Sequence, residues 1–93
     1  MSEMQKLEKY LKEHHYRFEK IKKSAMGIKD FQNQIFVYDE NGEIKWDVIC
    51  HVGSYGYEQG LLEIMGSIVK GIDSVEGFLT ADDIIKRLEE QDG

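Results

Sequence analysis

Three residues near the middle of the chain, Asp47, Cys50 and His51, are of the types that nucleophilic catalysis uses. A nearby imidazole can take the proton of a thiol, and the resulting thiolate is the nucleophile. Adjacent residues of a strand point to opposite faces, so a strand here would separate Cys50 from His51. Cys50 shares the parity of Trp46 and Val48 and is expected to be a buried small side chain. We therefore predict no catalytic residue and no enzymatic activity.

Residue types that bind metals also occur, but their spacing predicts no metal centre. His14 and His15 are neighbours, and the single cysteine offers no Cys-x-x-Cys pair for zinc. The run DENGEI is similar to part of a calcium loop. However, placing Gly42 at the sixth position puts Val37 first and Val48 twelfth, where oxygen ligands are required.

Three glycines, Gly53, Gly56 and Gly60, precede an apolar segment and raise the question of a phosphate-binding loop. Their spacing is G-x-x-G-x-x-x-G, without the Lys-Ser or Lys-Thr ending of a nucleotide site, so we predict no cofactor. A tight corner between a strand and a helix is the simpler interpretation. Tyr55 and Tyr57 within it have the composition of a binding hot spot.

A basic and aromatic stretch near the N-terminus could contact nucleic acid, with cations on phosphates and rings on bases. Whole-chain charge argues against this role, because a net charge of −6 repels polyanions unless the stretch is well separated from the acidic residues. Nucleic acid is therefore an unlikely partner from the sequence. The residues of the stretch are Tyr16, Arg17, Phe18, Lys20, Lys22, Lys23, Lys29 and Phe31.

The charge is unevenly divided along the sequence. Residues 1–38 hold eight basic and five acidic residues, whereas residues 39–93 hold four basic and thirteen acidic ones. The two parts carry +3 and −9, and an acidic surface favours a basic partner.

Length and composition indicate one soluble domain spanning residues 1–93. A chain of 93 residues can bury one modest hydrophobic core and leaves little room for a large cleft. The single cysteine excludes an internal disulfide, and no run of 18 apolar residues or signal-peptide pattern is present. These features predict a cytoplasmic protein that does not bind membranes.

The first half of the chain is expected to form a helix and three strands. Ser2 and Gln5 fit a capping box before an apolar stripe at helical spacing. A strand begins near Tyr16, residues 22–32 form a mobile connection, and a hairpin joins 34–39 to 44–50. Asn41-Gly42 predicts a type I′ turn that places Val37 opposite Trp46 and Ile35 opposite Val48. On that register the core side of the hairpin carries Ile35, Val37, Ile44, Trp46, Val48 and Cys50.

Two helices are expected in the second half. One covers 57–69, a short turn follows Gly71, and the last runs from Ala81 to Gln91 with Thr80 as N-cap. The sequence thus predicts an α+β fold of helix, three-stranded antiparallel meander and two C-terminal helices. The stripe of the first of these helices is Tyr57, Leu61, Leu62, Ile64, Met65, Ile68 and Val69.

The segment WDVICHVGSYGYEQGLLEIMG, with YDENGEI before it and VEGFLTADDII after it, resembles a group of small proteins encoded by phages and prophages of Gram-positive bacteria. The resemblance covers roughly residues 7–90 and carries no activity onto particular residues. It implies a cytoplasmic, mobile-element setting, where small acidic proteins often bind and disable a host protein, as anti-CRISPR proteins do.

We therefore expect a non-enzymatic interaction protein, namely an anti-CRISPR-like inhibitor that binds a basic surface of a host defence or nucleic-acid-handling protein. The alternatives are a nucleic-acid-binding regulator that uses the stretch from Arg17 to Lys29, and self-association as a homodimer. The expected partner-binding residues are Phe36, Tyr38, Trp46, Tyr55, Tyr57, Asp82, Asp83, Glu89 and Glu90.

Overall fold

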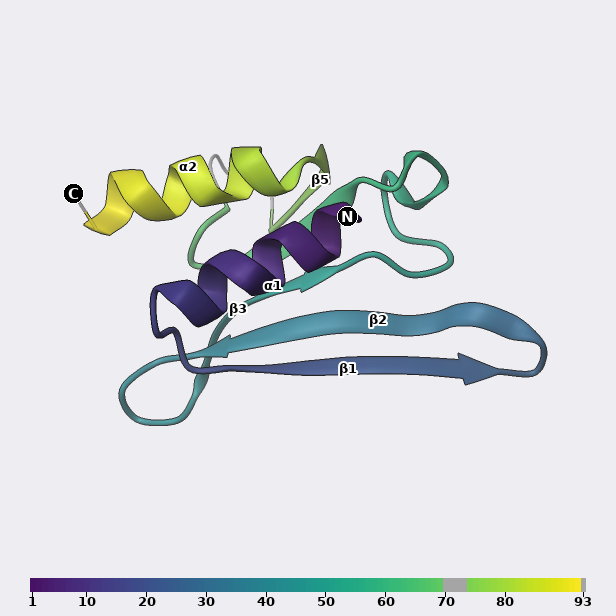
Figure 1. Cartoon of the computed structure of the whole chain (residues 1–93), viewed down its shortest axis with the longest axis horizontal. Helices are drawn as coiled ribbons and strands as arrows, with labels where there is room; N and C mark the ends of the chain where they lie inside the picture. Colours follow the sequence, from purple (N-terminus) through teal and green to yellow (C-terminus); the bar gives the residue numbers. More distant parts are fainter. Residues whose placement is uncertain (70–73, 93) are drawn as a thin grey trace.

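The computed structural model describes residues 1–69 and 74–92, which form two α-helices and a five-stranded antiparallel sheet (Figure 1). Neighbouring strands along the chain are neighbours in the sheet, in the order β1-β2-β3-β4-β5. The elements are α1 (Glu3–Glu13), β1 (Phe18–Ala25), β2 (Ile28–Tyr38), β3 (Ile44–Ile49), the 3-10 turn η1 (Tyr57–Gln59), β4 (Leu62–Gly66), β5 (Val75–Leu79) and α2 (Ala81–Asp92).

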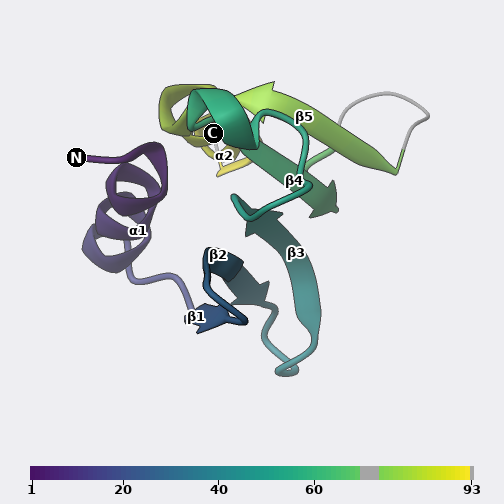
Figure 2. The same cartoon turned by 90° about the vertical axis from the view of Figure 1, so that its right-hand side faces the viewer.

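The sheet curves around both helices, which lie together on its concave face (Figure 2). Alternation along each strand then divides the residues between two faces. Two cross-strand rows, Phe18–Val37–Trp46–Gly66 and Lys20–Ile35–Val48–Ile64, face the helices. The two rows that alternate with them run from Glu19 through Phe36 and Asp47 to Met65, and from Ile21 through Gln34 and Ile49 to Glu63. These form the convex face, which neither helix covers.

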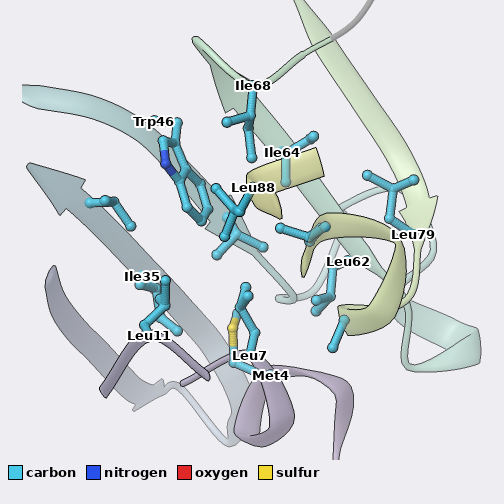
Figure 3. Packing of buried hydrophobic residues seen from close by; sticks show 14 residues of the cluster. Met4, Leu7, Leu11, Ile35, Trp46, Leu62, Ile64, Ile68, Leu79 and Leu88 are labelled. Carbon is cyan, nitrogen blue, oxygen red and sulfur yellow. The ribbon is translucent and has the colours of Figure 1, made fainter. Parts of the chain in front are cut away.

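The core lies between the concave face and the two helices (Figure 3). Burial of this much apolar surface supplies the main driving force for folding, at about 25 cal/mol per Å². Each helix contributes side chains at three- and four-residue spacing, as an amphipathic helix on a sheet requires. The buried cluster is Met4, Leu7, Leu11, Ile35, Val37, Trp46, Val48, Leu62, Ile64, Ile68, Leu79, Ala81, Ile84 and Leu88.

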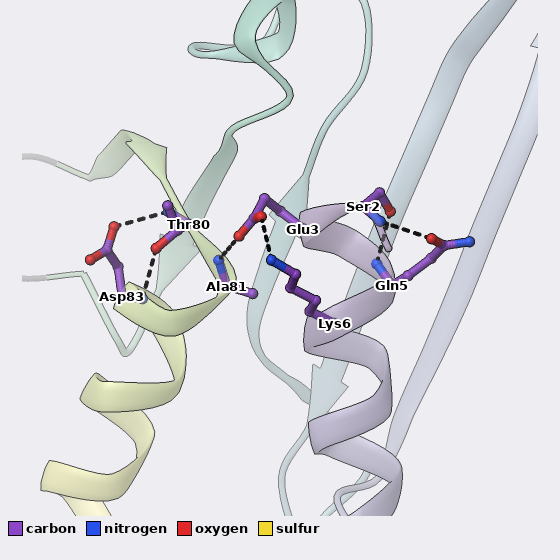
Figure 4. Close-up of polar contacts among 7 residues, drawn as sticks. All are labelled: Ser2, Glu3, Gln5, Lys6, Thr80, Ala81 and Asp83. Atoms are coloured by element: carbon purple, nitrogen blue, oxygen red, sulfur yellow. Dashed lines mark hydrogen bonds and ion pairs between the residues drawn. The ribbon is translucent and has the colours of Figure 1, made fainter.

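The predicted helix starts are confirmed. Ser2 Oγ accepts a hydrogen bond from Gln5 N–H at 3.1 Å, and Gln5 Oε1 accepts one from Ser2 N–H at 2.9 Å. Thr80 and Asp83 make the same reciprocal pair at the start of α2, at 3.1 and 2.9 Å. Figure 4 also shows Glu3 of α1 accepting from Ala81 N–H at 2.7 Å, so α1 contributes to the N-terminus of α2.

The predicted helix over 57–69 is wrong. Its first residues form η1, and Leu62–Gly66 is strand β4, which pairs with both β3 and β5. Gly60 and Gly66 have φ of +73° and +110°, and positive φ is incompatible with a continuous right-handed helix. A Cβ on Gly66 would lie 2.7 Å from Trp46 Cα, so β4 approaches β3 closely at this point. The expected architecture with three strands and two C-terminal helices is therefore replaced by five strands and one C-terminal helix.

The expected mobile connection over 22–32 is also wrong, because most of it is the β1–β2 hairpin. The tight turn of this hairpin is Met26-Gly27, where both residues have positive φ, as a two-residue type I′ turn requires. The turn predicted after Gly71 falls partly outside the described residues, and its later part is strand β5.

The β2–β3 hairpin has the predicted pairs, Val37 with Trp46 and Ile35 with Val48, but a different turn. Gly42 has φ of +80°, whereas Asn41 is not in the left-handed region. The carboxylate of Asp39 accepts hydrogen bonds from the N–H groups of Asn41 and Glu43 and favours a longer turn. The register shifts by one residue after Val37, which leaves Ile44 56% exposed and off the core side.

Candidate partner-binding site

The loop between β3 and β4, residues 50–61, holds a fixed shape through local hydrogen bonds. Ser54 Oγ accepts from His51 N–H at 3.1 Å, and Leu61 N–H donates to Gly56 O at 2.9 Å. Gly56 has φ of +93°, and a Cβ there would lie 2.9 Å from Leu61 Cβ and 3.1 Å from Phe78 Cα. The conformation of this loop therefore requires glycine at position 56.

The loop is anchored to β4 and β5 at Tyr55. The Tyr55 N–H donates to Glu63 Oε1 at 2.9 Å, and Phe78 N–H approaches Tyr55 O at 3.4 Å. Within the described part of the chain, Glu63 is the charged residue classed as buried, with 8% exposure. A Cβ on Gly77 would lie 2.4 Å from Tyr55 Cβ, so Tyr55 packs directly on the bare backbone of β5.

This anchoring presents two aromatic side chains to solvent. Tyr55 is 61% exposed and Phe78 is 58% exposed, and their ring centroids lie 6.3 Å apart with the planes tilted by 33°. Phe78 has φ of +59°, a conformation that is rare for a bulky side chain and costs about 1–3 kcal/mol. Both rings line a shallow cleft of about 430 Å³ together with Val52 and Tyr57. We call Tyr55 and Phe78 the aromatic pair.

The other aromatic residues expected at an interface occupy different places. Trp46 is 1% exposed in the core, so its side chain is not accessible to a partner. Phe36 is half-buried on the convex face, opposite Asp47. Tyr38 is half-buried at the C-terminal end of β2. Tyr57 is also half-buried, and its hydroxyl donates a hydrogen bond to Asp30 Oδ2 at 2.9 Å. The structure thus places one of the expected aromatic residues in the core and distributes the others over several surfaces.

The four acidic residues expected at the interface, Asp82, Asp83, Glu89 and Glu90, lie on α2 and are exposed. Asp83 has a second role, because hydrogen bonds from the backbone and side chain of Thr80 lower the pKa of its carboxyl group. Asp82 and Asp83 follow Phe78 in the chain by four and five residues, at the N-terminal turn of α2. A negative charge there is also favoured by the helix dipole.

Cys50, His51 and Asp47 do not form a catalytic arrangement. Asp47 Oδ2 accepts a hydrogen bond from Gln34 at 2.9 Å, and His51 Nδ1 is buried without a hydrogen-bond partner in the described part of the chain. Cys50 is half-buried against the core, and burial, followed by the charge of Asp30, raises the pKa of its thiol. A thiol with a raised pKa is a poor nucleophile at neutral pH.

Phe78 and Glu63 are the residues of this site that the sequence interpretation missed. Phe78 lay in a segment interpreted as a turn, although the run from Val75 to Leu79 contains strand-forming residues. Glu63 lay within the predicted helix, where its burial could not be anticipated. If Val75–Leu79 had been assigned as a strand, Phe78 and the apolar Leu79 would have been placed on opposite faces of the sheet, with Phe78 outside the core.

Comparisons with models of known protein families, with curated proteins and with solved structures found no match to this chain. The resemblance to phage and prophage proteins therefore stays a prediction. Within residues 1–69 and 74–92, no helix has the length and apolar character needed to cross a bilayer. The same residues contain no group of three or more histidine, cysteine, aspartate or glutamate side chains placed to hold a metal ion.

Proposed function

We propose that this protein is a non-enzymatic binding protein that docks on a basic surface of a partner protein through the aromatic pair and the acidic first turn of α2. The observation that carries the proposal is the exposure of two aromatic side chains: Tyr55, at 61%, on a loop fixed by Gly56 and Glu63, and Phe78, at 58%, on β5. A rigid, exposed aromatic side chain loses little entropy on binding, which is typical of interface hot spots.

The strained backbone of Phe78 supports a role for its side chain outside the fold. Phe78 does not enter the core, so its ring gives little stability in return for the positive φ. Asparagine or glycine would hold the same backbone more cheaply. The choice of phenylalanine at this position is explained by a contact that the ring makes with a partner.

The charge of the same region defines the chemistry of the partner. Glu58 is exposed on the loop, and Asp82 is exposed on the first turn of α2. An acidic rim around an apolar centre steers association with a basic surface and sets orientation. The class of partner that fits is a host defence or nucleic-acid-handling protein, because the ligand-binding surface of such a protein is basic. By binding to that basic surface, this chain would act as an inhibitor of the anti-CRISPR type.

The test is a site-specific cross-link from the aromatic pair. A photoreactive phenylalanine placed at position 55 should cross-link one defined protein in the bacterial host, and a Phe78→Asn substitution in the same chain should abolish that product. Asparagine tolerates positive φ, so this variant should fold at least as well as the parent. Ile44→Ser, which removes an exposed apolar side chain elsewhere, is the matched control and should leave the cross-link unchanged.

Two outcomes contradict the proposal. One is an equal cross-link yield from the parent and the Phe78→Asn chain. The other is a cross-link to a second copy of the chain, with light scattering giving twice the 10.8 kDa mass, which would assign the surface to a homodimer.

A further inference from the structure

The cleft at the aromatic pair carries charge of one sign. Its walls are formed by residues 52–59 and by Phe78, and Glu58 is the charged residue among them. Within the described part of the chain, no lysine or arginine lines this cleft. The remaining side chains of its walls are mostly apolar or aromatic. A ligand that enters the cleft therefore meets a negative charge beside exposed rings.

The carboxylate of Glu58 has no cation of its own. The residue is exposed and takes part in no ion pair of the described residues. Glu58 also borders the neighbouring cleft, which Lys22 and Lys29 line, but neither lysine nitrogen lies within 4 Å of its oxygens. Glu58 is therefore available to a cation that approaches from outside the chain.

A second carboxylate lies behind Tyr55. Glu63 is 8% exposed and accepts the Tyr55 N–H at 2.9 Å. No lysine, arginine or histidine nitrogen of the described residues lies within 4 Å of it. Burial of a carboxylate is unfavourable without a nearby positive charge. A cation bound against Tyr55 would be attracted by Glu63 as well as by Glu58.

The two rings of the aromatic pair can contact one cation together. The face of an aromatic ring carries partial negative charge and attracts a cation that lies within about 6 Å of the ring centroid. The centroids of Tyr55 and Phe78 are 6.3 Å apart, and both side chains are more than half exposed. One cation placed between or above the rings thus lies within reach of both.

The shape and charge of the cleft favour a guanidinium group over an ammonium group. A guanidinium is planar and weakly hydrated, stacks on aromatic faces and retains N–H donors for a carboxylate, whereas an ammonium is compact and strongly hydrated. Val52, which is 49% exposed at the cleft, offers an apolar surface to the methylene groups of an arginine. The cleft has about 430 Å³ and is shallow, so it can receive a side chain from a protein surface.

Other kinds of ligand fit this cleft less well. An anion would meet Glu58 without a lysine or arginine in the walls to receive it. An apolar side chain would remove water from the Glu58 carboxylate without replacing the lost hydrogen bonds. A cationic side chain satisfies both the carboxylate and the rings.

We propose that this cleft binds the guanidinium group of an arginine side chain on the partner protein, stacked on Tyr55 and Phe78 and paired with Glu58. This assignment rests on the proposed function and names the side chain by which the basic surface of the partner is recognised. Arginine is also among the residues that most often dominate interface energies, and such residues tend to pair with hot spots of the other protein.

The test is a titration of the full chain with the peptide acetyl-Gly-Arg-Gly-amide, followed by NMR through the ring protons of Tyr55 and Phe78. The same peptide with citrulline in place of arginine keeps the shape of the side chain and removes its charge. The arginine peptide should bind about fivefold or more tightly than the citrulline peptide, because the cation–π contact and the exposed ion pair each contribute a factor of about two to five. A lysine peptide should bind more weakly than the arginine peptide.

Two variants separate the carboxylate from the rings. Glu58→Gln should weaken binding of the arginine peptide about twofold to fivefold and leave the citrulline peptide unaffected. Phe78→Asn keeps the positive φ at low cost and should weaken binding of the arginine peptide by a similar factor. Glu43→Gln changes the net charge equally at an exposed position elsewhere and should bind both peptides as the parent chain does.

Four results overturn the assignment. They are equal affinity for the arginine and citrulline peptides, equal affinity for the arginine and lysine peptides, equal losses in Glu58→Gln and Glu43→Gln, and a dimer mass in light scattering that Arg17→Gln reduces to the monomer. The last result would place the exposed Arg17 of a second copy in the cleft.

Failure of this assignment differs from failure of the proposed docking. A cross-linked partner without a preference for arginine would remove the guanidinium and keep the docking surface. A preference for arginine without any cross-linked partner would do the reverse.

Discussion

Replacing Glu63 with alanine is expected to loosen the loop that carries Tyr55. The carboxylate is 8% exposed and accepts the Tyr55 N–H at 2.9 Å. A hydrogen bond to a charged group contributes about 1.5–3 kcal/mol, and an N–H left without a partner costs about 1–3 kcal/mol. Alanine also relieves the desolvation of the carboxylate, so the expected net loss in free energy of unfolding is about 2 kcal/mol. A loss of that size lowers the melting temperature of a domain this small by roughly 8–16 °C.

Two further variants isolate the hydrogen bond in that measurement. Glu63→Gln keeps an oxygen acceptor without the charge and should lose about 1 kcal/mol, whereas Glu58→Ala removes an exposed carboxylate of the same loop and should stay within about 0.5 kcal/mol of the parent. Urea unfolding gives the three free energies. Amide exchange at Tyr55 should accelerate roughly 30-fold in Glu63→Ala, because each 1.36 kcal/mol is a factor of ten. An alanine variant with parental stability and unchanged Tyr55 exchange would refute the anchoring role.

Three other predictions follow from the charged and titratable groups. Backbone N–H groups at the start of α2 lower the pKa of Glu3 and Asp83. The two ionised carboxylates therefore stabilise the folded chain at a pH above their unfolded pKa, near 4, and this stabilisation is lost as the pH falls through their lower folded pKa. Between about pH 5 and 2.5, the melting temperature of Glu3→Gln/Asp83→Asn should therefore decline less than that of the parent chain. Arg87→Met breaks the two-pronged ion pair with Glu76 and should cost about 2 kcal/mol in urea unfolding, with most of it recovered when Glu76 is also replaced by leucine. Iodoacetamide should alkylate Cys50 at pH 8 at least roughly tenfold more slowly in the folded than in the urea-unfolded chain, because burial raises the pKa of the thiol, and equal rates would contradict its placement.

Local signals predicted the ends of the fold and its central strand pair. The capping boxes at Ser2 and Thr80 involve residues three apart, so they form whatever surrounds them. Val37 faces Trp46 because alternation leaves one register that buries both side chains. These features depend on short stretches of sequence.

The errors arose where a local pattern fitted two structures. Leu61, Ile64 and Ile68 have helical spacing, but Leu62 and Ile64 also alternate as strand residues do. Pairing with β3 on one side and β5 on the other decided in favour of the strand. The β1–β2 hairpin likewise lacked a clean period, because its lysines occupy both faces and a bulge interrupts its register.

The candidate site was predictable in part. Tyr55 was expected at an interface because it belongs to a segment with the aromatic composition of a binding hot spot, and the structure exposes its side chain. Its neighbour Phe78 comes from a strand 23 positions later, so no local pattern joins the two rings. Trp46 was expected at the same interface, but its place in the core follows from two helices that close over β3.

The sequence by itself determined where α1 and α2 begin, that Val37 pairs with Trp46 and Ile35 with Val48, and that positive and negative charge separate along the chain. Each of these depends on neighbours in sequence or on a two-residue period. The tertiary structure alone decided that 57–69 adds a strand instead of a helix, that Tyr55 meets Phe78, and that residues 22–32 extend a hairpin instead of forming a loop. Those outcomes depend on contacts between distant segments, whose energies no local pattern contains.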